Sequence, residues 1–566
     1  MKKIITMMGL ALCAGLTMTS CKKGFLDRAA TTQQQDVDIF TSFNQTDLVI
    51  NNLYRRTPRV YGYLAGYNMS SATDESKDAS TWMASMRFNN GSWSGNDNPI
   101  GNTWRDNYVA IRQANSILEG IAKYNTPDDP NNPGYLENRI GEVYYLRAHF
   151  LAELLRQFGG AIIVTKTMLP TDIDELNKPR STYDQCVEQI SKDCDEAAKR
   201  LPTEYPASQA GRVTKGTCLA LKSRMTLYSA SPLWAIAGKT SARPDISSNN
   251  TASDPVKWQR AAAAAKAVID LRNKDGAEVY ALEPTLALRQ DMFKSTTLQS
   301  KEVIWVRMND FTGQALDQYI FSNGNGGWSG AAPTQNLVND YEMNDGLSIR
   351  TSPLYNPARP YINRDPRFYT DILYNRAQFK GRAIETQPGG RDEQSTATDR
   401  TRTGYFLRKL TDEAITIGQG AGRNVHGIVF RLAEIYLNYA EALNEYDPGN
   451  PEILTYVNRI RARAGQPNLP TGLTQDQMRQ RIRNERRIEL SFENHRFWDV
   501  RRWKIAETTE KEIFGMKAAP KAGAPDGYEY TIFKVEDRLW RNAMYVIPIT
   551  QDETLRNPNL QQNEGW

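Results

Sequence analysis

The sequence predicts a mostly α-helical fold, in which a scaffold of paired helices carries a loop-rich, irregular half with a few short strands. Apolar residues recur every three or four positions along most of the chain, which is the spacing of one helix face. Short loops separate consecutive periodic segments, as in helical-repeat proteins, although no clean repeat of about 34 residues is present. Two long stretches, at about 61–101 and 274–427, lack this periodicity. We therefore expect one domain over 21–566, with the scaffold at about 36–60, 102–273 and 428–505.

The first twenty residues differ from the rest and predict a secretory signal peptide at 1–20. Lys2 and Lys3 make a basic start, and residues 4–16 form an apolar stretch shorter than the roughly 20 residues that span a membrane. Ser20 directly before Cys21 resembles the lipobox of bacterial lipoproteins, so we expect Cys21 to be acylated and to anchor the mature protein. The alternative is plain secretion, with Cys21 at this place by chance.

Charge and cysteine usage narrow the class of protein. The formal net charge is +5, which is near neutral for 566 residues and gives no support for a nucleic-acid partner. Cys186, Cys194 and Cys218 are an odd number and show neither a disulfide framework nor a zinc spacing, so we expect small buried thiols.

Helices are predicted wherever apolar residues keep a period of about 3.6. In chain order these segments lie at 104–121, 143–158, 187–198, 219–228, 258–271, 429–443 and 453–464. The second should end at Gly159 and Gly160, because glycine readily adopts the backbone conformation that closes a helix. A short strand is predicted at 303–306, where Val, Ile, Trp and Val follow one another.

The two irregular stretches are where we expect a ligand site, because long loops in a compact protein are usually functional. A sugar ring has an apolar C–H face, which a flat Trp or Tyr ring can cover for about 0.5–1.5 kcal/mol per ring. Amide and carboxylate groups nearby can then bind the hydroxyls. The candidate residues are Trp82, Trp93 and Trp328, with Tyr67, Asn323 and Asp74 as further partners. The alternative is that these rings only pack their own loops.

Acidic residues near the C-terminus invite a catalytic interpretation, since Glu485, Glu489 and Glu493 share one helix face. Arginines alternate with them along the sequence, however, and this pattern favours ion pairs between neighbouring elements. We expect the same structural role for Arg431, Glu434 and Glu441.

Histidines give no sign of a reactive site. His149 lies within an apolar helical segment and is expected to pack rather than to react. No His pairs with another His or with a Cys at the spacing of a metal site or a nucleophile, so we expect neither a metal nor a cofactor. Two distant carboxylates could still meet in the fold as a glycosidase pair, and the sequence alone leaves this open.

Several segments resemble the motifs of one known family. Residues 431–442 (RLAEIYLNYAEA), residues 485–503 (ERRIELSFENHRFWDVRRW) and the ending at 547–566 resemble three hallmarks of the SusD/RagB family of nutrient-binding outer-membrane lipoproteins. Earlier segments that resemble the same family, in the same order, lie at 25–27, 104–121, 145–159 and 227–233. The resemblance spans nearly the whole mature chain.

This resemblance implies about four tetratricopeptide-like helix pairs as a scaffold and a more variable half that carries the ligand site. It also implies a SusC-like TonB-dependent outer-membrane transporter as partner, over which the protein acts as a lid. We therefore expect an outer-membrane lipoprotein, not an enzyme, that binds oligosaccharides or polysaccharide at the cell surface. The alternatives are a peptide-binding member of the same family and, from another class, a secreted glycoside hydrolase.

Overall fold

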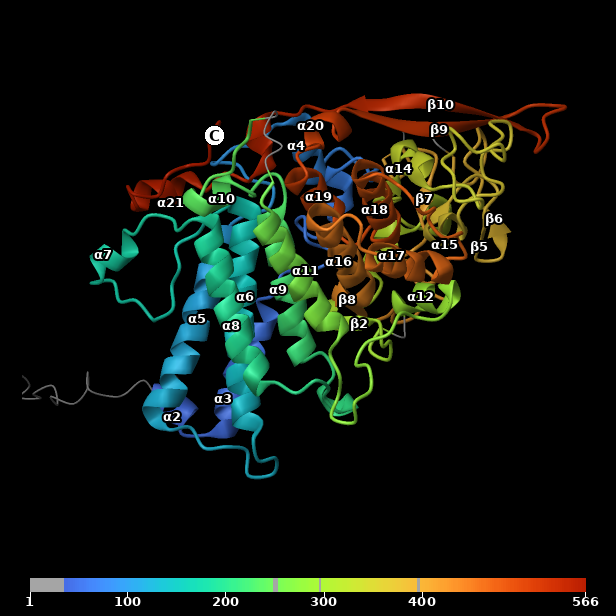
Figure 1. Ribbon diagram of the computed structural model, residues 1–566. Helices are drawn as coiled ribbons and strands as arrows, with labels where there is room; N and C mark the ends of the chain where they lie inside the picture. Colours follow the sequence, from blue (N-terminus) through green and yellow to red (C-terminus); the bar gives the residue numbers. More distant parts are fainter. Residues whose placement is uncertain (1–34, 248–252, 295–296, 394–397) are drawn as a thin grey trace, which may run out of the picture.

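The computed structural model describes residues 35–247, 253–294, 297–393 and 398–566. Long helices stand side by side in one half of the molecule, and shorter helices, loops and two-stranded ribbons fill the other (Figure 1). The predicted mostly α-helical fold, with an irregular half and a few short strands, is confirmed. The signal peptide expected at 1–20 and the acylation expected at Cys21 lie outside the described residues.

Consecutive helices of the helical half pack against one another, α5 on α6, α6 on α8, α8 on α9 and α9 on α11. Thr182 and Thr214 are the N-cap residues directly before α8 and α9. Each side chain accepts a hydrogen bond from a backbone N–H of the first helical turn, which has no partner within the helix. Helix α6 ends as predicted at Gly159, whose φ of 84° favours glycine. No helix among the described residues has both the length and the apolar character to cross a membrane. The helices of this half are α2 (Asp36–Phe40), α3 (Phe43–Arg55), α5 (Thr103–Tyr124), α6 (Tyr135–Phe158), α8 (Tyr183–Arg200), α9 (Lys215–Ala230) and α11 (Pro255–Ile269).

A second group of helices follows the irregular half. It comprises α16 (Leu432–Tyr446), α17 (Glu452–Arg463), α18 (Gln475–Glu489) and α19 (Arg496–Arg502). Helix α16 packs on α11, so the two groups form one continuous scaffold. The helix predicted from residue 429 begins only at Leu432, because Val429 belongs to strand β8 (Val425–Arg431). That strand pairs antiparallel with β2 (Val303–Phe311), which contains the strand predicted at 303–306.

The remaining elements are short. The helices are η1 (Met69–Ala72), α4 (Ser85–Asn90), α7 (Ile173–Leu176), η2 (Ala207–Gln209), α10 (Ala237–Thr240), α12 (Leu286–Met292), α13 (Ala315–Ile320), η3 (Asn323–Asn325), α14 (Gln335–Asp340), α15 (Pro366–Asp371), α20 (Ala506–Thr509), η4 (Asn542–Tyr545) and α21 (Gln551–Arg556). The strands are β1 (Ser76–Lys77), β3 (Ala332–Pro333), β4 (Ile372–Leu373), β5 (Gln378–Phe379), β6 (Arg382–Ala383), β7 (Phe406–Leu407), β9 (Glu512–Pro520) and β10 (Tyr528–Asp537). Strands β9 and β10 form a long antiparallel hairpin that projects along the top of Figure 1 and that we did not expect.

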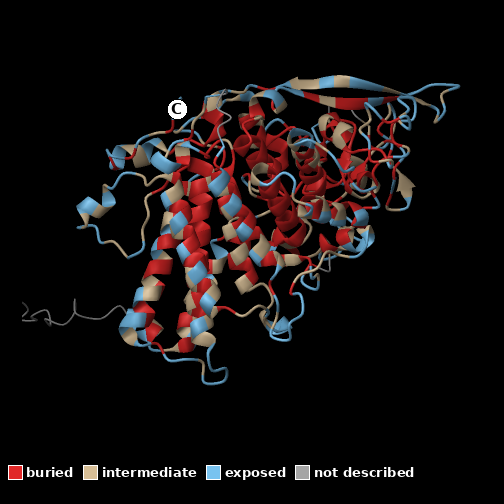
Figure 2. Cartoon of the chain, in the orientation of Figure 1, coloured by how far each residue is buried: buried red, intermediate tan, exposed pale blue. Residues whose placement is uncertain are grey.

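Two hydrophobic cores hold the fold together. The larger one fills the space between the scaffold helices and reaches the C-terminal segment around Ile547. The smaller one lies in the irregular half around Phe368, Tyr341 and Phe492. Buried residues are continuous along the inner faces of the long helices, while the outer faces alternate between exposed and intermediate (Figure 2). The three cysteines of the described residues are unpaired and buried, as predicted: Cys186, Cys194 and Cys218.

Candidate ligand-binding site

The two irregular stretches, far apart in sequence, are joined in the structure. Strand β1 pairs antiparallel with β3, with Ser76 opposite Pro333 and Lys77 opposite Ala332. Asp78, directly after β1, strengthens the junction, because its carboxylate accepts hydrogen bonds from the Tyr319 hydroxyl at 2.7 Å and from the Ala331 backbone N–H at 3.1 Å. The loops that carry the candidate aromatic residues are therefore anchored to one another.

Three aromatic rings lead from this junction to the surface. Tyr319 is buried, and the Tyr67 ring packs on it with 5.2 Å between ring centroids. Trp82 packs edge-to-face on Tyr67 at 5.7 Å and is itself 64% exposed. We call Trp82, Tyr67 and Tyr319 the aromatic platform. Its outermost ring is supported from below and open to solvent above, which is the geometry that a stacked sugar ring needs.

Trp328 and Asn323 lie on the loop that follows α13, the helix that carries Tyr319. The Trp328 backbone N–H donates to the Gln318 carbonyl at 2.8 Å, and the half-buried indole packs on the smaller core. Asn323 is also half-buried, and its side-chain oxygen has no hydrogen-bond partner among the described residues. An unpaired amide oxygen is costly when buried, so Asn323 is a candidate partner for a hydroxyl group. Both residues remain predicted ligand contacts.

The prediction for Trp93 is corrected by its burial. Only 4% of Trp93 is exposed, and its ring is enclosed by Phe88 at 4.8 Å and by Trp566 at 4.4 Å between centroids. The C-terminal residue therefore covers the face that a sugar would need. Trp93 belongs to the larger core, where it packs its own loop against the chain end.

The prediction for Asp74 is corrected by its partners. Its two carboxylate oxygens accept hydrogen bonds from Arg487 at 2.6 Å and from Arg496 at 2.8 Å. Burial alone would raise the pKa of Asp74, but these two guanidinium groups outweigh burial and hold that pKa below its usual value. Asp74 thus fastens the first irregular stretch to α18 and α19 and does not serve the platform.

The acidic residues of α18 and its following turn form ion pairs, as predicted. Glu489 is fully buried among four arginines, and the distances from its carboxylate are 2.6 Å to Arg463 and 2.8 Å to Arg431. Burial alone would raise the pKa of Glu489, but the surrounding guanidinium groups outweigh it and hold that pKa well below its usual value. The other pairs are Glu485 with Arg367 and Arg461, Glu493 with Arg431 and Lys409, Glu434 with Arg224, and Glu441 with Arg502. These carboxylates hold separate elements together.

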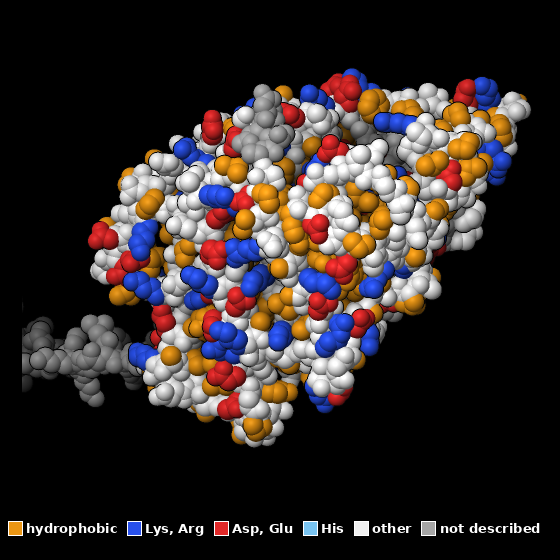
Figure 3. Space-filling view, viewed as in Figure 1, with side chains coloured by type: hydrophobic (Ala, Val, Ile, Leu, Met, Phe, Trp, Pro, Cys, Tyr) orange, Lys and Arg blue, Asp and Glu red, His pale blue; other side chains and the backbone are white. Residues whose placement is uncertain are grey.

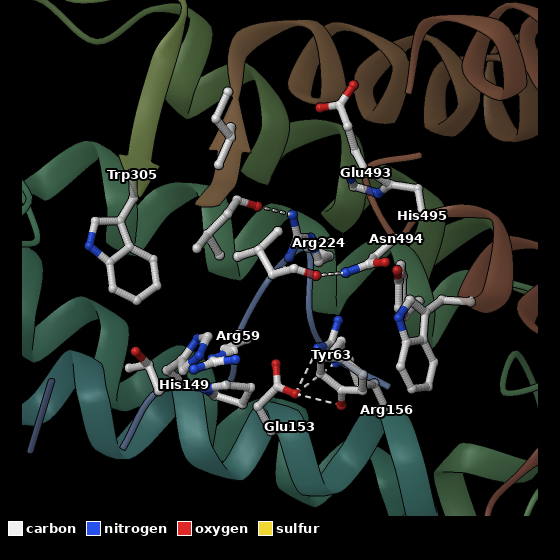
Figure 4. A pocket seen from close by; sticks show the side chains of 17 residues that line it. Arg59, Tyr63, His149, Glu153, Arg156, Arg224, Trp305, Glu493, Asn494 and His495 are labelled. Atoms are coloured by element: carbon white, nitrogen blue, oxygen red, sulfur yellow. Dashed lines mark hydrogen bonds and ion pairs between the residues drawn. The ribbon is translucent and has the colours of Figure 1, made fainter. Parts of the chain in front are cut away.

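A small cavity beside His149 is too confined for a sugar (Figure 4). Its volume is 40 Å³, which is enough for a few water molecules and far below that of usual ligand pockets. His149 packs against Trp305 at 5.3 Å, as predicted for a core residue. Burial lowers its pKa to about 4, so the ring is neutral. Figure 4 shows that the Glu153 carboxylate accepts hydrogen bonds from the Tyr63 hydroxyl and from Arg156, so these polar groups already have partners within the protein.

Two residues of the site, Tyr319 and Asp78, were not predicted from the sequence. Asp78 gives no sequence signal, since a single Asp in a Ser-rich loop is common in turns. Tyr319 lies on a helix too short to show a periodic pattern. Only its position beneath Tyr67 shows that it supports the platform.

Comparisons with known proteins agree with this architecture. Residues 301–566 match the SusD family, and residues 24–227 match a family described as starch-binding associating with outer membrane. A SusD-like protein from Bacteroides fragilis superposes with a TM-score of 0.76 at 26% identity, over 94% of this chain and 100% of that one. A SusD-like carbohydrate-binding protein from the same organism gives 0.75 at 25% identity, over 92% and 100%.

Comparison by sequence also finds a SusD-like relative. SusD-like protein P2 of Formosa agariphila is 24% identical over 486 residues, which are 81% of this chain and 79% of that protein. The two family matches cover residues 24–227 and 301–566, and residues 228–300 lie between them. The hallmark segments in α16, α18 and the C-terminus all fall within the first of these matches. The chain belongs to the SusD/RagB family.

Proposed function

We propose that this protein is an outer-membrane lipoprotein that binds oligosaccharides or polysaccharide at the cell surface and delivers them to a SusC-like TonB-dependent transporter as its lid. The aromatic platform would cover the apolar face of a sugar ring, and Asn323 and Trp328 would contact the next part of the chain. Each stacked ring contributes about 0.5–1.5 kcal/mol, so a few contacts give the weak binding that capture and release require.

The observation that carries this proposal is the exposure of Trp82. An indole that is 64% exposed gains little from folding, yet its ring is held against Tyr67, which rests on buried Tyr319. A flat aromatic ring fixed in this way at the surface is available to cover the apolar face of a sugar ring. The relatives support the kind of ligand, since one solved relative is named a carbohydrate-binding protein.

Two buried carboxylates of the irregular half already have partners, which favours binding without chemistry. Asp78 is buried and accepts hydrogen bonds from Ser71 and Tyr319 among others. Asp392 is buried and paired with Arg382 at 2.6 Å. A glycosidase needs one carboxylic acid and one free carboxylate on either side of the scissile bond, and carboxylates occupied in this way serve neither role.

Isothermal titration of the purified protein against a panel of neutral oligosaccharides tests the proposal. Binding should weaken several-fold in Trp82→Ala, and Leu555→Ala should leave it unchanged, because Leu555 is an exposed apolar residue on α21. A peptide panel separates the glycan proposal from capture of peptides. Release of reducing ends from a bound polysaccharide would instead establish a glycoside hydrolase.

The membrane anchor is tested separately. Cys21→Ser should move the protein from the outer-membrane fraction to the soluble fraction, because the acyl chains would be lost. Co-purification of a barrel transporter with the wild-type protein would support the lid role. Retention of the Cys21→Ser protein in the membrane fraction would contradict the anchor assignment.

A further inference from the structure

A second groove opens where the C-terminal hairpin crosses the irregular half. Its walls come from α14, α18, α20, β9 and β10, which meet near the top of the molecule in Figure 1. Its volume is 750 Å³, within the range of sites for small ligands. Neither Trp82, Tyr67 nor Trp328 lines it, so it is separate from the aromatic platform.

The acidic side chains that line this groove are all engaged with basic partners. Asp74 and Asp340 both contact the Arg487 guanidinium, at 2.6 and 2.8 Å. Glu512 and Asp537 both contact one lysine of β10, at 3.4 and 2.9 Å. Each acidic side chain of the lining therefore already has a basic partner within the protein.

Two basic side chains of the same lining are free. Arg350 and Lys511 are exposed, and neither forms an ion pair with any of the described residues. The other two lining cations are bound, Arg487 as above and Arg538 to Glu536 at 2.7 Å. The groove thus offers two cations without an ion-pair partner among the described residues. The face shown in Figure 3 carries charged side chains of both signs.

The rest of the lining suits a saccharide. Phe514 and Trp540 are half-buried at the groove and present aromatic surface beside the cations. The Asn339 side-chain oxygen accepts a hydrogen bond from Gln335 at 2.7 Å, which leaves its NH₂ group for a ligand. A guanidinium group binds planar carboxylates and sulfate groups through two parallel hydrogen bonds. Cation, amide and aromatic ring together match an acidic sugar better than a bare ion.

We infer that this groove is a second saccharide site, which takes an acidic sugar residue whose carboxylate or sulfate ester binds Arg350 and Lys511. The sugar ring lies toward Phe514 and Trp540. The site does not depend on the aromatic platform, so it can exist whether or not the platform binds neutral glycans.

Titration calorimetry with a galacturonic acid tetrasaccharide, a sulfated oligosaccharide and a neutral tetrasaccharide tests this inference, with Trp82→Ala as background so that the platform does not contribute. The acidic ligands should bind, and the double variant Arg350→Ala/Lys511→Ala should weaken them by about tenfold or more, since each removed contact is a hydrogen bond to a charged group. Lys274→Ala is the matched control, because Lys274 is an exposed lysine outside the groove. Binding should also fall as salt is added.

The arms of the experiment separate the possible ligands. Binding of the uronate alone identifies a carboxylate site, and binding of the sulfated ligand alone identifies a sulfate site. Equal binding of the neutral sugar, or affinity that the double variant leaves unchanged, overturns the inference. Competition by inorganic sulfate at the same concentration as the oligosaccharide also overturns it, because the groove would then bind an anion and not a sugar.

Discussion

The hydroxyl of Tyr319 donates a 2.7 Å hydrogen bond to the carboxylate of Asp78. This bond joins two irregular stretches that lie 241 residues apart in the chain. Both groups are buried, and the Tyr319 ring also supports Tyr67. One buried contact therefore holds the loops together and fixes the rings that face solvent.

Tyr319→Phe should destabilise the protein, because it leaves the ring in place and deprives buried Asp78 of one hydrogen-bond donor. We expect a loss of about 1–3 kcal/mol in the free energy of unfolding and a weaker affinity for neutral glycans. Denaturant unfolding and calorimetry measure the two effects. Tyr135→Phe is the control, since the Tyr135 hydroxyl makes no hydrogen bond to a described residue. An unchanged stability of Tyr319→Phe would show that the bond does not hold the junction.

Trp82→Ala should mainly weaken glycan binding, whereas Trp93→Ala should mainly lower stability. Trp82 is 64% exposed, so its loss should change the free energy of unfolding by no more than about 0.5 kcal/mol and should weaken glycan binding. Trp93 is buried between Phe88 and Trp566, so its loss should cost about 3–5 kcal/mol of stability. Thermal unfolding of both variants, followed by titration of those that fold, checks this. Equal stability losses would contradict the assigned roles.

Glu489→Gln should destabilise the protein severely, because it removes the negative charge shared by four buried arginines. Breaking a buried ion pair in this way costs about 3–5 kcal/mol. Glu188→Gln is the control, since Glu188 pairs with Arg260 at the surface and such pairs contribute about 0–1 kcal/mol. The midpoint of urea unfolding is the measurement. A similar shift for both variants would mean that the buried cluster adds little to stability.

The scaffold was predictable because its signals are local. Apolar spacing predicted the helices that became α5, α6, α8, α9 and α11, and Gly159 marked the end of α6. The alternation of Glu and Arg in α18 likewise predicted ion pairs. Their partners were not predictable, because Arg289 and Arg463 reach Glu489 from separate elements that sequence spacing does not relate.

The site was only partly predictable, because exposure depends on distant parts of the chain. Trp82 and Trp93 lie in the same irregular stretch with similar neighbours, and nothing in the sequence separates them. Trp93 is covered in part by Trp566, which is 473 residues further along the chain. The hairpin of β9 and β10 was not predicted. No residue of β10 is buried, so this strand adds no apolar run of a core to the sequence.

Gly330→Ala should displace Tyr319, the buried ring of the aromatic platform. A Cβ atom at Gly330 would overlap the Tyr319 ring, which cannot move without displacing Tyr67. We expect a loss of about 1–3 kcal/mol of stability, as for overpacking in a core, together with weaker glycan binding. Gly449→Ala is the matched control, since nothing lies within 4 Å of its Cβ position. Neither Gly330 nor Gly449 has a left-handed φ, so the two variants differ in the contact with Tyr319.

The contribution of His149 to stability should fall as the pH is lowered from about 6.5 to 4. Burial lowers the pKa of His149 to about 4, and Glu153 only partly opposes this effect. The unfolded chain, with a usual His pKa near 6.5, therefore binds a proton that the folded protein excludes, and unfolding becomes easier as the pH falls through this window. The shift in the pKa of His149 corresponds to about 3 kcal/mol of stability, lost by about pH 4.

His149→Phe keeps a ring against Trp305 and cannot take up the proton, so its stability should fall less steeply over the same range. Urea unfolding at pH 7.5, 5.5 and 4.5 measures the difference in stability between the two proteins, from which the contributions of the titrating groups that they share cancel. Parallel pH dependence of the variant and the wild type would show that His149 titrates normally in the folded state.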